Sequence, residues 1–98
     1  MRATKQNAHE FIARQQTFKT GGALSGYNVS NNIYVIYSYK EPIAAWISGK
    51  GWLVTTTKFS LTTSHHTKKA RQGAEKYTEL DSDALKMAIY EAKRHVMQ

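Results

Sequence analysis

The sequence predicts an α+β fold: a three- to four-stranded antiparallel sheet with an N-terminal helix, a short basic helix and a C-terminal amphipathic helix packed on one face. Two patterns lead to this prediction. Residues 81–96 repeat apolar side chains at helical spacing behind an acidic N-cap. Four central segments are rich in β-branched and aromatic residues and are separated by turn sequences: residues 24–29, 33–39, 43–48 and 52–59. A chain of 98 residues suffices for one core, so residues 1–98 are interpreted as a single domain.

The first element is predicted to be a helix over residues 4–16. Thr4 is a suitable N-cap residue, and Ala8, Phe11 and Ile12 share one face at helical spacing. The segment that follows, residues 19–28, contains three glycines. Glycine at this density is expected to end the helix.

Short turns are predicted between the strands, because the residues there favour reversal of the chain. Asparagine and serine suit the first turn, proline ends strand pairing at the second, and glycine admits positive φ at the third. These turns are expected at residues 30–32, at Lys40-Glu41-Pro42 and at Gly49-Lys50-Gly51.

The C-terminal helix has the clearest start signal in the chain. Asp81 is the expected N-cap, with Leu80 before it and Leu85 after it placed to form a hydrophobic staple. Acidic residues in the first turn also suit the positive end of the helix dipole. The stripe expected to lie across one face of the sheet consists of Leu85, Ile89, Ala92 and Val96.

The segment of residues 58–73, KFSLTTSHHTKKARQG, predicts a strand that leads into a short basic helix. Ser64 or Thr63 is the expected N-cap and Gly73 the expected stop. A helix that starts here would present free N–H groups and the positive end of its dipole beside His65 and His66, which suits a phosphate.

Basic residues gather in the same region, with Glu75 as the acidic residue among them. A charged helix face is also often simply solvated, and the hydroxyl groups could serve only as caps. The residues predicted to bind nucleic acid or another anion are Lys58, Ser64, His66, Lys68, Lys69, Arg71 and Lys76.

The composition indicates an anionic partner. Fourteen Lys and Arg against seven Asp and Glu give a net charge of +7, which favours nucleic acid, an acidic protein surface or anionic lipid. The chain has no cysteine, so disulfides and thiolate metal sites are excluded. With no apolar run of transmembrane length, we expect a cytoplasmic protein with no membrane partner.

Aromatic residues are frequent in the predicted strands. Most are expected to pack in the core, but helices on one side would leave an open sheet face where some could contact a partner. Trp46 and Trp52 flank the glycine turn and are expected to pair across it. The candidate interface aromatics are Tyr34, Tyr37, Tyr39, Trp46 and Trp52. Residues 33–39, if they formed an edge strand, could pair with a second copy in a homodimer.

A pattern over residues 33–71 combines a tyrosine-rich strand, Pro-Ile-Ala, a tryptophan, and an aromatic-Ser-x-Thr-Thr-Ser-x-His segment that runs into a basic helix. The matching residues are Tyr37, Tyr39, Pro42, Ile43, Ala44, Trp52, Phe59, Ser60, Thr62, Thr63, Ser64, His66 and Arg71. This pattern resembles a small uncharacterised domain carried by bacteriophages and other mobile elements, in which tyrosine would stand at Phe59. The resemblance implies an origin, and by analogy a role in binding, such as the inhibition of a CRISPR effector.

The histidines are the candidate catalytic residues of the chain. His65 and His66 are adjacent, so on a helix they point about 100° apart and do not converge on one atom. No motif with metal-ligand spacing is present, and neither a metal nor a cofactor is predicted. A metal-independent ribonuclease would need two bases and a cation around a phosphate. His66, Arg71 and Tyr77, with His9 or His95, could supply these groups.

The function predicted first is therefore a small non-enzymatic, phage-type protein that binds DNA, RNA or a host-defence nucleoprotein complex through its basic helix. The first alternative is a protein-interaction module that uses the open sheet face against an acidic host protein. The second alternative is the ribonuclease.

Overall fold

The structure is a computed structural model that describes residues 8–20, 24–57, 61–74 and 76–96, with the backbone alone described for 61–64 and 95–96. Within these residues the elements, in chain order, are α1 (Ala8–Ala13), β1 (Phe18–Lys19), β2 (Leu24–Ser30), β3 (Ile33–Ser38), β4 (Glu41–Ile47), β5 (Gly51–Thr55), α2 (Leu61–Ala74), β6 (Thr78–Leu80) and α3 (Ser82–Val96). The α+β class predicted from the sequence is confirmed.

The described strands form one six-stranded sheet in the order β1-β2-β3-β4-β5-β6. Strands β1 to β5 form an antiparallel meander, and β6 pairs in parallel with β5 after the chain crosses over through α2. The sheet is therefore mixed and wider than the three or four antiparallel strands predicted. The strands that sequence patterns missed are β1, with two residues, and β6, with three, and neither is long enough to show a β pattern.

Strand β3 lies inside the sheet, paired with β2 on one side and with β4 on the other. Its backbone groups are thus already used in two ladders. The expectation that residues 33–39 form an edge strand is wrong, and so is the route to a homodimer that rested on it. A homodimer formed in another way stays a prediction.

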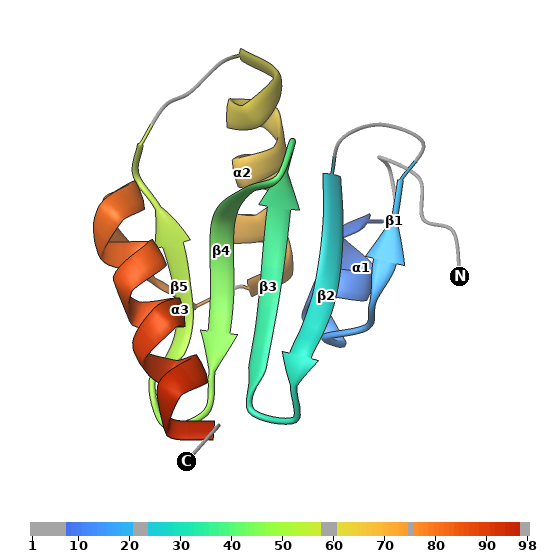
Figure 1. The fold of residues 1–98 in the computed structure, drawn as a ribbon. Helices are drawn as coiled ribbons and strands as arrows, with labels where there is room; N and C mark the ends of the chain where they lie inside the picture. The colour runs from blue at the N-terminus through green and yellow to red at the C-terminus, as the bar shows by residue number, and fades with distance from the viewer. Residues whose placement is uncertain (1–7, 21–23, 58–60, 75, 97–98) are drawn as a thin grey trace.

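Helices cover both faces of the sheet rather than one, which corrects the predicted arrangement (Figure 1). Helices α1 and α2 pack on one face, and α3 packs over β3, β4 and β5 on the other. Strand β3 shows why both faces need cover. Tyr34 and Ile36 are buried under α1 and α2, whereas Ile33 and Val35 are buried under α3. An uninterrupted apolar run is the pattern of a strand buried on both faces.

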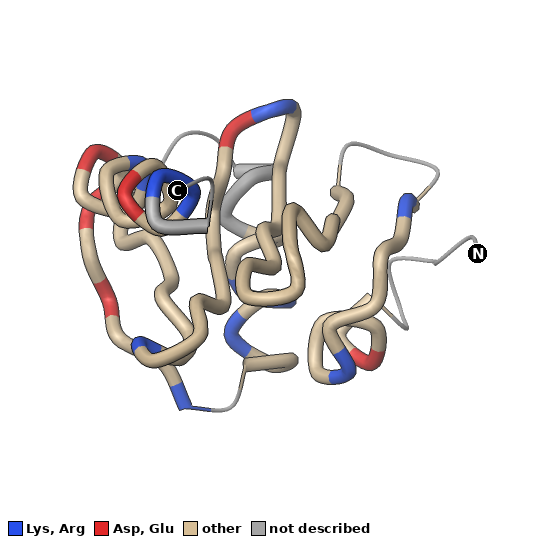
Figure 2. The backbone as a smooth tube through the Cα atoms, turned by 60° about the horizontal axis from the view of Figure 1, so that its bottom comes forward, with Lys and Arg blue, Asp and Glu red and all other residues tan. Residues whose placement is uncertain are grey.

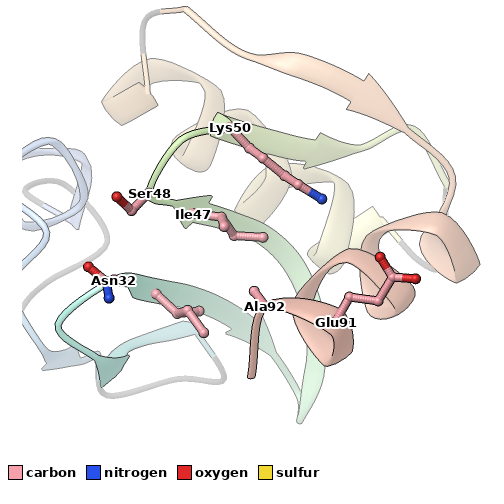
Figure 3. A pocket seen from close by; sticks show the side chains of 7 residues that line it. Asn32, Ile47, Ser48, Lys50, Glu91 and Ala92 are labelled. Atoms are coloured by element: carbon pink, nitrogen blue, oxygen red, sulfur yellow. The ribbon is translucent and has the colours of Figure 1, made fainter. Parts of the chain in front are cut away.

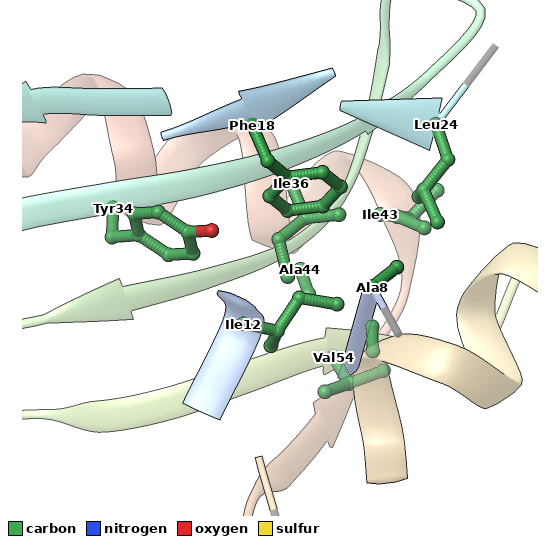
Figure 4. Packing of buried hydrophobic residues seen from close by; sticks show 10 residues of the cluster. Ala8, Ile12, Phe18, Leu24, Tyr34, Ile36, Ile43, Ala44 and Val54 are labelled. Atoms are coloured by element: carbon green, nitrogen blue, oxygen red, sulfur yellow. The ribbon is translucent and has the colours of Figure 1, made fainter. Parts of the chain in front are cut away.

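The core beneath α1 and α2 is built around Tyr34, the largest side chain with almost no exposure (Figure 4). Its ring meets Trp52 edge to face at a centroid distance of 5.9 Å. Its hydroxyl donates a hydrogen bond of 2.8 Å to the carbonyl oxygen of Gln16. Burial raises the pKa of Tyr34, so the phenol stays neutral and is satisfied by the loop that follows α1.

The predicted hairpin at Gly49-Lys50-Gly51 is confirmed, with φ values of 88° at Gly49 and 79° at Gly51. Trp46 and Trp52 pair directly across it, as predicted.

The turn predicted at Lys40-Glu41-Pro42 is displaced. Tyr39 and Lys40 make the turn instead, with φ values of 53° and 76°, and Glu41 already begins β4. Pro42 lies within the strand beside an irregularity where Ile36 pairs with Ala44 and Tyr37 pairs with Pro42. This leaves Ile43 as an extra residue, and proline, which has no N–H to donate, is tolerated at such a bulge.

The start of α3 is as predicted. The backbone N–H of Ala84 donates to Asp81 Oδ1 at 2.7 Å, and that of Leu85 donates to the Asp81 carbonyl oxygen at 3.0 Å. Leu80 packs against the cluster that contains Leu85 and Ile89. The side chain of Val96, the end of the predicted stripe, lies outside the described residues.

Helix α1 ends at Ala13, three residues before the end predicted for it. Residues 4–7 of the predicted helix, with the expected cap Thr4, lie outside the described residues. The helix ends before the glycines, because Gln15 adopts a φ of 54° and closes it. The N–H groups of Gln15 and Gln16 donate to the carbonyl oxygens of Ile12 and Phe11 at 3.0 and 2.9 Å. This is the bonding of a Schellman motif.

Gly73 has a role that the sequence did not suggest. It lies inside α2 and does not stop the helix, which continues to Ala74. A Cβ atom on Gly73 would sit 2.5 Å from Ile12 Cγ2 and 2.8 Å from the carbonyl oxygen of His9. The absence of a side chain therefore allows α1 to lie directly against α2.

We predict that Gly73→Ala destabilises the fold, although alanine is a better helix former than glycine by about 1 kcal/mol. The new methyl group would push against the backbone of α1, and overpacking of this kind costs about 1–3 kcal/mol. Chemical denaturation of Gly73→Ala and of the exposed neighbour Gln72→Ala provides the comparison. A Gly73→Ala variant that is more stable than wild type would show that α1 does not pack this closely.

Candidate functional site

The sequence predicts an anion-binding site at the N-terminus of helix α2, but in the structure this helix starts earlier than predicted. The helix begins at Leu61, so Ser64 lies inside it and is not its N-cap. The free N–H groups of a helix belong to its first four residues, all of which precede His65 and His66. The prediction that Ser64 starts the helix is therefore wrong, and His66 does not lie among the free N–H groups of the first turn. Binding of an anion by the residues predicted for it stays a prediction. The side chain of Ser64 and all of Lys58 lie outside the described residues.

His66 faces the sheet rather than solvent, with 4% of its surface exposed. Its Nδ1 lies 2.7 Å from Oγ of Ser38, which is 1% exposed at the end of β3. The ring of Tyr39 lies 6.2 Å from the imidazole. A serine beside a histidine can make a nucleophile and its base, but neither group here can meet a substrate. The pair instead joins α2 to the β3–β4 turn.

The outer face of α2 keeps the basic character predicted for it. The residues that it buries are His66, Thr67, Ala70, Gly73 and Ala74. On the opposite side, His65, Lys68 and Gln72 are exposed, and Lys69 and Arg71 are half-buried at the margins. Lys76, also exposed, follows the helix. We call Lys68, Lys69, Arg71 and Lys76 the basic face of α2.

This basic face is not neutralised by the rest of the described chain. Residues 61–74 contain no acidic residue. Four of the described acidic residues lie on β6, between β6 and α3, or on α3 (Figure 2): Glu79, Asp81, Asp83 and Glu91. The salt bridge that the described residues make joins Lys86 of α3 to Glu41, well away from α2 in sequence and on the other face of the sheet. Nε of Arg71 is buried and has no hydrogen-bond partner among the described groups. No described carboxylate forms an ion pair with Lys68, Lys69, Arg71 or Lys76.

The five candidate interface aromatics divide between the two faces of the sheet. Tyr34 is fully buried, and Trp46 and Trp52 are half-buried against the core beneath α1 and α2. Tyr39 is 61% exposed at the β3–β4 turn. Tyr37 is half-buried on the side of α3, where its ring meets Tyr27 at a centroid distance of 6.0 Å. The open sheet face that was predicted is thus reduced to the part that α3 leaves uncovered.

Sequence reasoning missed Tyr27 and Tyr90, both of which lie on that side of the molecule. Tyr27 pairs across the strands with Val35, which is buried under α3. Tyr90 lies on α3 and is 57% exposed. Part of the signal for Tyr27 was present in the sequence. Ser25 and Tyr27 are two residues apart in a strand and therefore point to the same face of the sheet, which Lys19 of β1 shares.

A separate hollow of about 320 Å³ lies where the β2–β3 and β4–β5 turns approach the end of α3 (Figure 3). Its lining residues are Asn32, Ile33, Ile47, Ser48, Lys50, Glu91 and Ala92. Its polar lining consists of one ammonium, one carboxylate, one amide and one hydroxyl group, from Lys50, Glu91, Asn32 and Ser48.

In the part of the chain that the structure describes, no three His, Cys, Asp or Glu side chains come together as ligands for a metal ion. None of the described helices combines the length and the apolar character that a membrane crossing requires.

The fold and the site thus define a small α+β protein with a basic helix face. Residues 1–85 match the model of a family described as "Family of unknown function (DUF8033)", and because the match spans more than half of the 98 residues, the chain belongs to this family. Comparison with curated proteins and with solved structures gives no match.

We predict that His66→Ala lowers the free energy of unfolding by about 1–3 kcal/mol, because it removes the contact with Ser38 and leaves a void beneath α2. His65→Ala is the matched control, since that side chain is exposed and should change stability by less than about 0.5 kcal/mol. Both values follow from urea denaturation. Equal effects at the two histidines would contradict the structural role assigned to His66.

Proposed function

We propose that this protein binds nucleic acid, DNA or RNA, through the basic face of α2 and that it acts by binding rather than by catalysis. The observation that carries the proposal is the division of α2 into two faces. One face is anchored to the sheet and to α1 by Ala70, Gly73 and the buried His66. The other presents Lys68, Lys69 and Arg71 with no acidic residue between them.

Rigid support for the cations favours binding to a polyanion. Because α1 and the sheet hold α2 in place, the backbone that carries its lysines is already ordered. Little further conformational entropy is therefore lost when these lysines bind a ligand. If the four residues of the basic face each neutralise one phosphate, log K should fall with log[salt] with a slope of about −3.6 for duplex DNA. Affinity would then fall roughly 150-fold between 50 and 200 mM salt.

The biological setting that we propose is host defence. The sequence pattern over residues 33–71 resembles phage-borne domains, and a basic protein of that origin would meet nucleic acid inside a defence complex. In this setting the protein would act as an anti-CRISPR-like inhibitor, with the RNA or DNA of a bacterial nucleoprotein as the partner of α2.

A second candidate function is a module that binds an acidic host protein through the sheet face beside α3. The uncovered Tyr27 and Tyr37 favour it. The ribonuclease alternative gains no such support, because His66, its central residue, is buried. His95, another of its residues, has a side chain outside the described residues.

We predict that reversing the charge of the α2 face, by Lys68→Glu, Lys69→Glu and Arg71→Glu together, weakens binding of random-sequence duplex DNA by more than about 100-fold at 100 mM salt. The salt slope should become less steep by about 2.7, which is the contribution of three phosphates. Fluorescence anisotropy across a salt series measures both quantities.

The control carries the same change in net charge at exposed bases elsewhere, Arg14→Glu, Lys50→Glu and Arg94→Glu. It should keep most of the affinity, because those residues do not lie on α2. Equal losses in the two variants would show that net charge alone attracts the DNA. Absence of binding by the wild-type protein at 50 mM salt would reject the proposal altogether.

A further inference from the structure

The sheet face opposite α1 and α2 is covered only in part by the described chain. On this face, helix α3 lies against β3, β4 and β5, and no described helix covers β2 (Figure 1). Side chains of β2 and of the end of β3 are therefore accessible there. Ser25 pairs with Tyr37 across these strands, and Tyr27 lies two residues further along β2 on the same face.

Two adjoining hollows open on this face, and Tyr37 lines both of them. The first measures about 370 Å³ and is lined by Ser25, Tyr27, Tyr37 and Lys40. The second measures about 180 Å³ and is lined by Tyr37, Pro42, Lys86, Ile89, Tyr90 and Lys93. Together they form a groove, the tyrosine groove, that crosses from β2 over Tyr37 to α3. The larger hollow is at the small end of the range for ligand pockets, suited to one planar group.

The charge of the groove is positive. Lys40 and Lys93 line it without an ion pair to any described carboxylate, while Lys86 is paired with Glu41 at 2.8 Å. Asp83, one turn before Lys86 on α3, adds a second negative charge near that pair. Two ammonium groups thus remain, one at each end of the groove. An anionic ligand whose charges are spaced along a chain would match this layout.

The backbone offers the ligand little, because β3 is paired on both sides and β2 is paired with β3 and, at Ser25 and Gly26, with β1. Beyond β1, the N–H of Asn28 donates to Thr17 Oγ1. An acidic peptide that bound here could not add to a strand edge and would leave its own N–H and C=O groups unmatched. What the groove does offer is phenol rings and ammonium groups. Burial, and to a smaller extent the neighbouring Tyr27, raise the pKa of Tyr37. The hydroxyl therefore stays uncharged and does not repel a phosphate.

We propose that the tyrosine groove binds single-stranded nucleic acid, with bases stacked on Tyr27, Tyr37 and Tyr90 and the intervening phosphates near Lys40 and Lys93. Stacking is tolerant of sequence, because every base has a π-face. The site lies on the opposite side of the sheet from α2 and does not depend on the function proposed for that helix.

The test uses the full-length protein and fluorescently labelled oligo(dT), with labelled duplex DNA and poly-glutamate as further probes. The double variant Tyr27→Leu/Tyr37→Leu should bind oligo(dT) more weakly by roughly 5- to 150-fold for each base that loses its ring. Its affinity for duplex DNA should stay within about twofold of wild type. The matched control Tyr27→Phe/Tyr37→Phe keeps the rings and should retain binding of oligo(dT).

Unchanged affinity of the leucine variant for oligo(dT) would overturn the proposal. So would a poly-glutamate affinity that depends on the same tyrosines as strongly as oligo(dT) does, since that result assigns the groove to an acidic protein. If the leucine variant fails to fold, Lys40→Gln/Lys93→Gln changes only groove lysines and should lower the salt slope for oligo(dT) by about 1.4. An unchanged slope would again reject the groove. Charge reversal on α2, by contrast, alters duplex binding, so failure of one site leaves the other testable.

Discussion

The burial of β3 on both faces is the constraint on which the rest of the structure depends. Four consecutive apolar residues, Ile33 to Ile36, must all be covered, and they point alternately to opposite sides of the sheet. One helix layer cannot do this. Helices α1 and α2 therefore close one side and α3 the other, and the parallel pairing of β6 with β5 follows from the crossover that α2 makes between them.

This arrangement also determines which polar side chains remain exposed to solvent. On α2, the requirement to pack against α1 and β3 removes His66 and Thr67 from solvent and leaves the basic side outward. On the other side, α3 does not cover β2, so Tyr27 and Tyr37 are only half-buried. Both surfaces proposed for nucleic acid therefore follow from the way the helices cover the sheet. The basic face is the side of α2 that points away from the sheet, and the tyrosine groove lies beside α3.

Local signals were enough to predict parts of the fold, namely the glycine hairpin, the Asp81 cap and the main strands, because each is fixed by residues close in sequence. The start of α2 could not be predicted from Ser64, a good cap that tertiary packing overrides. Neither could the place of His66, since only the folded chain brings Ser38 beside it. The basic residues were identified correctly as a cluster in sequence, but which of them point outward depends on α1, whose close contact at Gly73 has no local signature.

The two edges of the sheet have a consequence for the behaviour of the protein in concentrated solution. Edge strands with long rows of free N–H and C=O groups recruit further strands and promote aggregation. Here the described edges are β1 and β6, with two and three residues, and Asn28 beside β1 is bonded to Gln15 and Thr17 instead of being left open. The apolar centre of the sheet is therefore shielded laterally, and a chain this rich in β-branched and aromatic residues offers neighbouring molecules little template for fibril growth.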